Sequence, residues 1–194
     1  MIETLSEAIA EITRQLERGA SQRKSAMHTP VVATADADQR VMVLREFDAA
    51  KRRLRFHTDA RSPKCGGIGD SAPVSVLFYD FDTKTQIRAR GTGRIEHYGP
   101  VADAAWESST TFARRCYLAE DAPGAVSQMG TSGLPEWAEG IQPSEDQVAP
   151  ARENFAVLLV TLERLDWLYL DNSGHRRAVF TDGAEGWAGE WAVP

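Results

Sequence analysis

Residues 40–64, RVMVLREFDAAKRRLRFHTDARSPK, decide which fold the chain can form. Two runs rich in apolar and β-branched residues, 41–47 and 54–58, predict a pair of strands joined by a basic turn. Arg40 stands at the start of the first strand, whereas Lys64 stands at the start of a short predicted helix. Cations in these positions can bind an anionic group, but a solvated charged rim gives the same pattern.

The segments on either side predict a mainly β fold. Apolar residues recur at spacings of four, three and four from Leu5 to Leu16, which predicts a helix over residues 1–20. Residues 116–150 are rich in Gly, Pro, Ser and acidic residues and predict a long irregular loop. Hairpin connections favour a single domain over residues 1–194, built as a closed antiparallel β-barrel with peripheral helices. Further strands are predicted at residues 30–35, 74–79, 85–97, 155–162, 167–170 and 177–181, and helices at 62–70 and 100–112.

The strand predicted at residues 85–97 has two different faces. Gln86, Arg88 and Arg90 alternate with apolar residues and therefore point to one side of the strand. Gly91 follows and indicates a bulge or a close approach of another backbone segment.

Composition and charge limit the classes of protein. With 194 residues, 42% hydrophobic and 26% charged, the chain is typical of a globular protein. A net charge of −6 argues against general binding to nucleic acid. The sequence shows neither a membrane-spanning run nor a secretory signal, so we expect a cytoplasmic protein without a membrane partner. Cys65 and Cys116 predict free thiols, and no metal-ligand spacing is present.

Several segments, taken in order, resemble the pyridoxamine 5′-phosphate oxidase-related flavoproteins, which bind FMN on a split β-barrel. That family has an R-x-x-L-L-K strand, an aromatic-Thr-Asn step, a Ser-Arg-Lys triplet, strands of the L-L-F-Y-W and R-Q-V types, an E-x-W strand, an H-x-R step and a closing L-A-P. The resemblance covers residues 30–98 and 153–194, and the ordered set is more specific than any single motif. The matching segments are RVMVLR at 40–45, HTD at 57–59, SPK at 62–64, LFY at 77–79, TQI at 85–87, DW at 166–167, HRR at 175–177 and AVP at 192–194.

The resemblance implies an FMN site that is formed in a homodimer, at the interface between the subunits. Arg40 and Lys64 would bind the FMN phosphate, with Ser62 donating a hydrogen bond. Arg45 and His175 would contact a small-molecule substrate, and no general base is implied. The other implied cofactor contacts are the strand at Val41, Met42 and Val43, then His57, Thr58 and Gln86, and, from the partner subunit, Trp167 and Arg177.

Some of these implied contacts have an ordinary structural alternative. Trp167 by itself fits a core residue, Gln86 a surface strand residue, and Arg177 a charge on a hairpin. Pro63 stands where the family triplet has Arg, and Arg61 is the nearby residue that can supply the missing charge.

The implied substrate site departs from the family more than the implied cofactor site does. Arg45 stands where the oxidases have a Lys that binds the substrate phosphate, and Arg does not replace Lys neutrally. Arg114 and Arg115 offer an alternative anion site in place of the lost partners. In the oxidases that Lys acts together with a Tyr, an Arg and a Ser, and the corresponding positions here are Ala105, Ser109 and Ala113. Ser173 stands where the family has an Arg two residues before its His.

Three functions therefore stay open. The favoured one is an FMN-dependent oxidoreductase acting on an undetermined small substrate, with a deazaflavin as an alternative cofactor. The second is a genuine pyridoxamine or pyridoxine 5′-phosphate oxidase, which the lost phosphate contacts weaken. The third is a non-enzymatic flavin-binding, stress-related protein.

Overall fold

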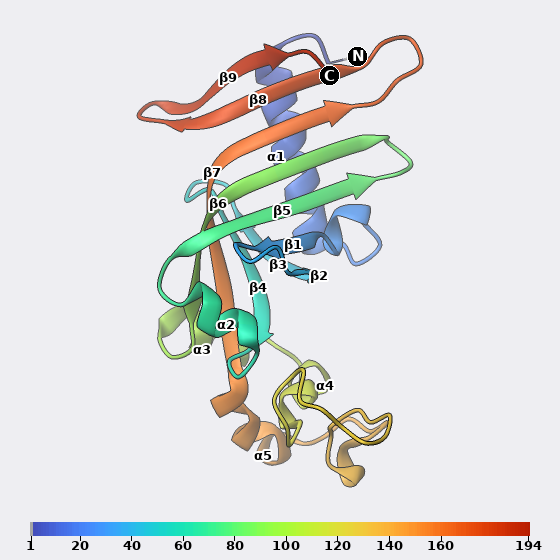
Figure 1. Cartoon of the computed structure of the whole chain (residues 1–194), viewed down its shortest axis with the longest axis vertical. Coiled ribbons are helices and arrows are strands. Elements are labelled where there is room, and N and C mark those ends of the chain that lie inside the picture. Colours follow the sequence, from blue (N-terminus) through green and yellow to red (C-terminus); the bar gives the residue numbers. More distant parts are fainter. Residues whose placement is uncertain (1) are drawn as a thin grey trace. The chain divides into compact units, whose positions relative to one another are not determined.

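The computed structural model describes residues 2–194 and shows a mainly antiparallel sheet with helices (Figure 1), so the predicted fold class is confirmed at that level. The strands are β1 (Val31–Thr34), β2 (Gln39–Val41), β3 (Leu44–Asp48), β4 (Arg53–Asp59), β5 (Ala72–Asp80), β6 (Thr85–Glu96), β7 (Phe155–Tyr169), β8 (Arg176–Gly183) and β9 (Gly186–Ala192). The α-helices are α1 (Leu5–Ser21), α2 (Pro63–Ile68), α3 (Pro100–Glu107), α4 (Thr111–Arg114) and α5 (Glu145–Val148). Short 3₁₀ helices are η1 (Ala26–His28), η2 (Arg115–Leu118), η3 (Glu136–Ala138) and η4 (Ala149–Asn154).

The strands do not close into a barrel. Their order is β2-β1-β5-β6-β7-β4-β3, and β8 and β9 branch from β7. The branch arises because different parts of the long strand β7 have different neighbours. Residues 164–169 pair with β8, whereas the backbone N–H of Leu162 donates to the carbonyl of Arg52, just before β4. Within residues 2–194 no pairing joins β2 to β3, so the predicted closed barrel is not confirmed.

The chain forms two compact units, which are described separately. Unit 1 comprises Met1–Phe56, Ser71–Arg94 and Leu159–Pro194, and unit 2 comprises His57–Asp70 and Ile95–Leu158. The single domain expected over residues 1–194 stays a prediction.

Helix α1 belongs to unit 1 and has a capped start. The Thr4 hydroxyl accepts from the Glu7 backbone N–H, and the Glu7 carboxylate accepts from the Thr4 backbone N–H, which forms a capping box. Ile12 and Leu16 are buried, and α1 packs against β3, β8 and β9 across the strands (Figure 1). Of the helix predicted over residues 1–20, residue 1 lies outside the described residues.

The sheet of unit 1 has one buried face and one outer face, as strand alternation requires. Val76 and Ile87 are fully buried on the face toward α1, whereas Leu77 and Arg88 pair with each other on the opposite face, here called the outer face. A Cβ atom added to Gly91 would collide with the carbonyl oxygen of Thr161 in β7, so only glycine allows this approach, the second of the two alternatives that the sequence left open.

Unit 2 holds the segment that was predicted as a long loop. Residues 116–150 contain η2, η3 and α5 among irregular turns, so they have more helical structure than the sequence indicated. The helix predicted at residues 100–112 is two helices, because α3 ends at Glu107 and Thr110 caps α4 by accepting from the Ala113 backbone N–H.

Candidate functional site

The outer face of unit 1 brings together two of the residues implied to bind FMN. Gln86 pairs with Tyr79 across β5 and β6, and Arg177 of β8 pairs with Leu168 of β7. Arg177 and Arg88 both bind Asp166 of β7, which places Arg177 on the same face as Arg88 and hence Gln86. The side chains of Leu77 and Tyr79, 38% and 44% exposed, add an apolar component to this face.

Trp167 lies on the other face of the same sheet. It pairs with Ala178, only 1% of its surface is exposed, and its ring stacks 6.2 Å from the ring of Tyr169. Its Nε1 is buried without a hydrogen-bond partner among the described residues. Because Trp167 and Arg177 point to opposite faces, the structure does not bring these two predicted contacts together. A contact between Trp167 and FMN stays a prediction.

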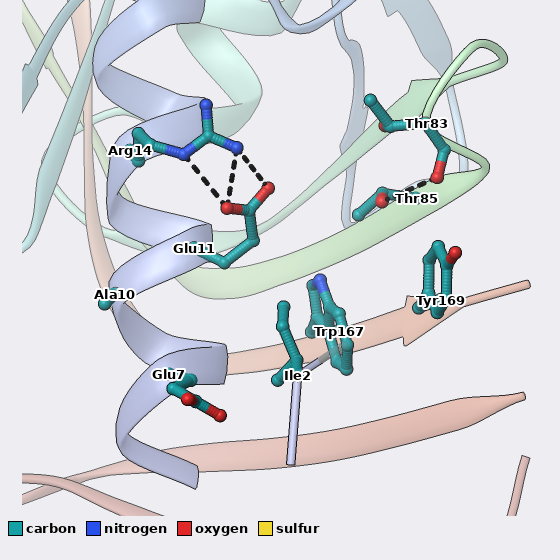
Figure 2. Close-up of a pocket in the computed structure, with 9 residues that line it drawn as sticks. All are labelled: Ile2, Glu7, Ala10, Glu11, Arg14, Thr83, Thr85, Trp167 and Tyr169. Carbon is teal, nitrogen blue, oxygen red and sulfur yellow. Dashed lines mark hydrogen bonds and ion pairs between the residues drawn. The ribbon is translucent and has the colours of Figure 1, made fainter. Parts of the chain in front are cut away.

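A pocket of about 550 Å³ lies where Trp167 meets the flank of α1 (Figure 2). Figure 2 shows α1 on one side of it and the ends of β6 and β7 on the other. The bidentate hydrogen bonds between Arg14 and Glu11 hold both side chains against α1. The lining residues are Ile2, Glu7, Ala10, Glu11, Arg14, Thr83, Thr85, Trp167 and Tyr169.

A second pocket, of about 230 Å³, lies on the outer face and contains four arginines. Arg177 donates to both carboxylate oxygens of Asp166, at 3.0 and 2.8 Å, and Arg88 donates to the same carboxylate. Burial opposes ionisation of Asp166, but the hydrogen bonds from Arg177 and Arg88 outweigh it and hold the pKa of Asp166 below its usual value. We call this set the arginine pocket, and its lining residues are Arg88, Arg90, Arg164, Asp166 and Arg177.

Arg40 lies at the edge strand β2 of unit 1. Its guanidinium donates to the Asp38 carboxylate and, at 3.1 Å, to the Thr34 hydroxyl. Its neighbour Val41 is exposed and Met42 is buried, so the side chains alternate along the strand that was predicted to lie beside the flavin ring. A phosphate at Arg40 would share the guanidinium with Asp38.

Lys64 and Ser62 lie together in unit 2, at the start of α2. The Lys64 ammonium donates to the Ser62 hydroxyl at 2.7 Å. Because Arg40 is in unit 1 and Lys64 is in unit 2, the phosphate clamp that they were predicted to form stays a prediction.

The remaining predicted residues of unit 2 are packed around β4 and α2. Thr58 is buried, with its hydroxyl 3.8 Å from the Cys65 sulfur, and the His57 ring meets the Phe155 ring edge-on at 5.0 Å. Arg61, suggested as a substitute cation, instead binds the Asp59 carboxylate at 2.8 Å and donates to the backbone carbonyls of residues 119 and 120. Its hydrogen bond with Asp59 raises the pKa of Arg61.

The two residues predicted to contact substrate are exposed. Arg45 lies in β3, and His175 lies in the turn between β7 and β8. The Nδ1 atom of His175 accepts from the backbone N–H of Asp171 at 3.2 Å. Hydrogen bonds, chiefly from Ser173, lower the pKa of Asp171 to about 2, so this turn is held by an ionised carboxylate near neutral pH.

Arg114 and Arg115 do not form the alternative anion site that the sequence suggested. The buried guanidinium of Arg114 donates to the carbonyls of Trp106 and Glu107, both at 2.8 Å, and forms an ion pair with Glu145 at 2.5 Å. Arg115 donates to the carbonyls of residues 138 and 141. These two arginines therefore hold the segment 116–150 in place, and all three guanidinium nitrogens of Arg114 donate hydrogen bonds.

Sequence reasoning missed the arginine pocket. The alternation of Gln86, Arg88 and Arg90 was visible, but Arg164 and Asp166 reach them only through the pairing of strands that lie about 75 residues apart in the chain. Among the described residues, no group of three or more His, Cys, Asp or Glu side chains is placed to hold a metal ion, and no helix is long and apolar enough to cross a membrane.

Comparisons with known proteins give the family context. Residues 7–97 match the family model described as pyridoxamine 5′-phosphate oxidase, FMN-binding domain. None of the curated protein sequences matches the chain. The matched residues include Arg40, Lys64 and Gln86 and end before Trp167 and Arg177.

Solved structures with the same fold extend over nearly the whole chain. One is a pyridoxamine 5′-phosphate oxidase-related, FMN-binding protein of Nostoc punctiforme, 21% identical, with a TM-score of 0.72 over 100% of both chains. Another is PhzG of Burkholderia lata in complex with tetrahydrophenazine-1-carboxylic acid, 16% identical, with a TM-score of 0.70 over 96% of this chain and 92% of that one. A third, from Clostridium acetobutylicum, is related to general stress protein 26; it is 10% identical, with a TM-score of 0.53 over 90% and 95% of the two chains. The predicted resemblance is therefore confirmed: residues 7–97 match the model of the pyridoxamine 5′-phosphate oxidase FMN-binding domain, and a solved structure described as related to that oxidase has the same fold.

Proposed function

We propose that this protein binds FMN and uses it as an oxidoreductase acting on a small molecule. The observation that carries the proposal is the match of residues 7–97 to the FMN-binding domain model. When bound, FMN supplies the redox chemistry, and the protein contributes binding and orientation.

The residues of the chain fit such a cofactor in several places. Lys64, paired with Ser62, supplies a cation and a hydroxyl group for the phosphate, and Arg40 supplies a guanidinium. Leu77, Tyr79 and Gln86 form an outer face that is part apolar and part amide, which suits a flat heteroaromatic ring. Trp167 fits less well, because it is buried under the opposite face.

We propose that two copies of the chain form a homodimer with the flavin between them. The support is that the outer face of unit 1 exposes the large apolar side chains of Leu77 and Tyr79, which a second copy would cover. A cytoplasmic location stays a prediction.

Pyridoxamine 5′-phosphate is the less supported substrate. Ala105 is buried, and the Ser109 hydroxyl donates to the Ala105 carbonyl at 2.8 Å, so neither provides a free phosphate ligand. Arg45 and His175 remain as exposed substrate contacts.

The test is a titration of purified protein with FMN, followed by analytical ultracentrifugation and turnover assays. We expect one FMN per chain, a dimeric mass, and reduction of the bound flavin by a nicotinamide cofactor or a small reducing substrate. Protein that stays colourless and takes up no added FMN contradicts the proposal. Rapid oxidation of pyridoxamine 5′-phosphate would identify that compound as the substrate.

A further inference from the structure

We infer that the arginine pocket binds the phosphate group of a small organic phosphate monoester, at a place separate from the proposed FMN phosphate contacts. The pocket is built by three neighbouring strands of unit 1, with Arg88 and Arg90 on β6, Arg164 and Asp166 on β7, and Arg177 on β8. Arg88, Arg90 and Arg164 have no place in the proposed flavin site, so the inference goes beyond the proposed function and shares with it only Arg177.

The charge of the pocket calls for an anion. Four guanidinium groups face one carboxylate, which leaves three positive charges in excess. Asp166 binds Arg88 and Arg177, whereas Arg90 and Arg164 make no side-chain hydrogen bond or ion pair within residues 2–194. The Nε of Arg88 is also buried without a partner among the described residues. A dianionic phosphate presents enough oxygen atoms to satisfy these donors, and planar guanidinium groups bind such an anion through paired hydrogen bonds.

The space beside the arginines suits the organic part of the ligand. Arg90 also lines an adjoining groove of about 460 Å³, whose walls include Ala33, Pro73 and Val74. Glu163, the acidic residue of this groove, accepts a hydrogen bond from the Thr92 hydroxyl at 2.5 Å. A phosphate held by the arginines would therefore place an apolar group against the small side chains of Ala33, Pro73 and Val74.

Asp166 occupies the pocket as an internal anion and competes with the ligand. Its carboxylate is buried and takes donors from Arg88 and Arg177 that a phosphate would otherwise use. Replacing Asp166 by Asn keeps the shape and removes the competing charge. The site therefore predicts that removing Asp166 strengthens phosphate binding, whereas removing an arginine weakens it. Loss of folding would weaken binding in both cases.

The test is isothermal titration of the full chain with phenyl phosphate, inorganic phosphate and benzoate at one ionic strength. We expect phenyl phosphate to bind about tenfold more tightly than inorganic phosphate, because the groove buries the ring, and more tightly than benzoate, whose charge is lower. Arg88→Gln and Arg164→Gln should each weaken phenyl phosphate by about tenfold, and Asp166→Asn should tighten it several-fold. Arg23→Gln removes the same charge from an exposed part of unit 1 and should change nothing.

Titration of FMN-saturated protein separates this site from the flavin site. Phenyl phosphate should still bind when FMN is present, and should also bind if the protein fails to take up flavin at all. The inference is overturned if FMN displaces phenyl phosphate, if benzoate binds equally well, or if both Arg variants bind like the unaltered protein. Thermal unfolding identifies any variant that is unfolded. If Arg88→Gln is unfolded, the binding of phenyl phosphate to Arg164→Gln, at an exposed residue, and to Asp166→Asn, with its opposite expected effect, still tests the inference.

Discussion

Arg114→Met provides a quantitative test of how unit 2 is held together. The substitution keeps an apolar stem against Trp106, above whose ring the guanidinium lies at 4.9 Å, and removes the donors to the carbonyls of Trp106 and Glu107. Hydrogen bonds from a charged donor contribute about 1.5 kcal/mol or more each, so losing two should lower the free energy of unfolding by about 3 kcal/mol. The ion pair adds little, because the Glu145 side chain is 71% exposed.

Urea unfolding followed by circular dichroism measures this change, with Glu145→Gln as the matched control. We expect the control to lose less than about 0.5 kcal/mol. A loss below about 1 kcal/mol for Arg114→Met, or equal losses for the two variants, would show that Arg114 does not satisfy the end of α3. The interpretation of Arg114 as a structural residue rather than an anion ligand would then be wrong.

Three further predictions concern backbone space, thiol reactivity and acid stability. Gly91→Ala should destabilise the protein by more than about 2 kcal/mol in urea unfolding, because the added methyl group meets the Thr161 carbonyl. Gly66→Ala, with open space in α2, should instead stabilise the protein by about 0.5 kcal/mol. Similar changes in unfolding free energy for both variants would refute the collision at Gly91. Ellman's reagent should modify one thiol quickly, because Cys116 is exposed, whereas burial raises the pKa of Cys65 and slows its reaction; a fast phase that survives Cys116→Ser would contradict this. The pKa of Asp166 is lowered on folding, so its contribution to stability is present above its ordinary pKa of 3.8 and is lost as the pH falls through the lower folded value. The difference in unfolding free energy between the unaltered protein and Asp166→Asn should therefore shrink below about pH 4. A difference that grows below that pH would contradict this prediction.

Local patterns in the sequence predicted much of the fold. The spacing of apolar residues from Leu5 to Leu16 predicted helix α1, and the alternation around Arg88 gave the two faces of β6 correctly. Gly91 predicted either a bulge or a close approach of another backbone segment, and the structure shows the close approach. These features depend on neighbours within a few residues, which is the range over which sequence patterns are informative.

The errors come from contacts between distant segments. Strand β7 was predicted as two strands because Glu163 and Arg164 interrupt its apolar run, yet both are exposed side chains within one continuous strand. Neighbours in a regular strand point to opposite faces, so two exposed residues in a row indicate a local irregularity rather than an end. The branch of the sheet at β7 prevents the predicted closure, and no local pattern reports which strands share an edge.

The candidate site divides in the same way. The resemblance of residues 62–64 to the family triplet implied a shared role for Ser62 and Lys64, and in the structure the Lys64 ammonium donates to the Ser62 hydroxyl at 2.7 Å, although their contact with a phosphate stays a prediction. The burial of Arg114 and the meeting of Arg88 with Asp166 required the fold itself, because their partners lie 31 and 78 residues away.

Comparison of FMN with riboflavin tests the central proposal most directly, because the two differ only in the phosphate. Fluorescence titration of the full chain should show FMN binding at least about 100-fold more tightly than riboflavin, with Lys64→Ala and Arg40→Ala each reducing that preference by about tenfold and Arg23→Gln leaving it unchanged. Equal affinity for the two flavins, or no measurable binding of either, would contradict the proposal that this chain holds FMN by its phosphate.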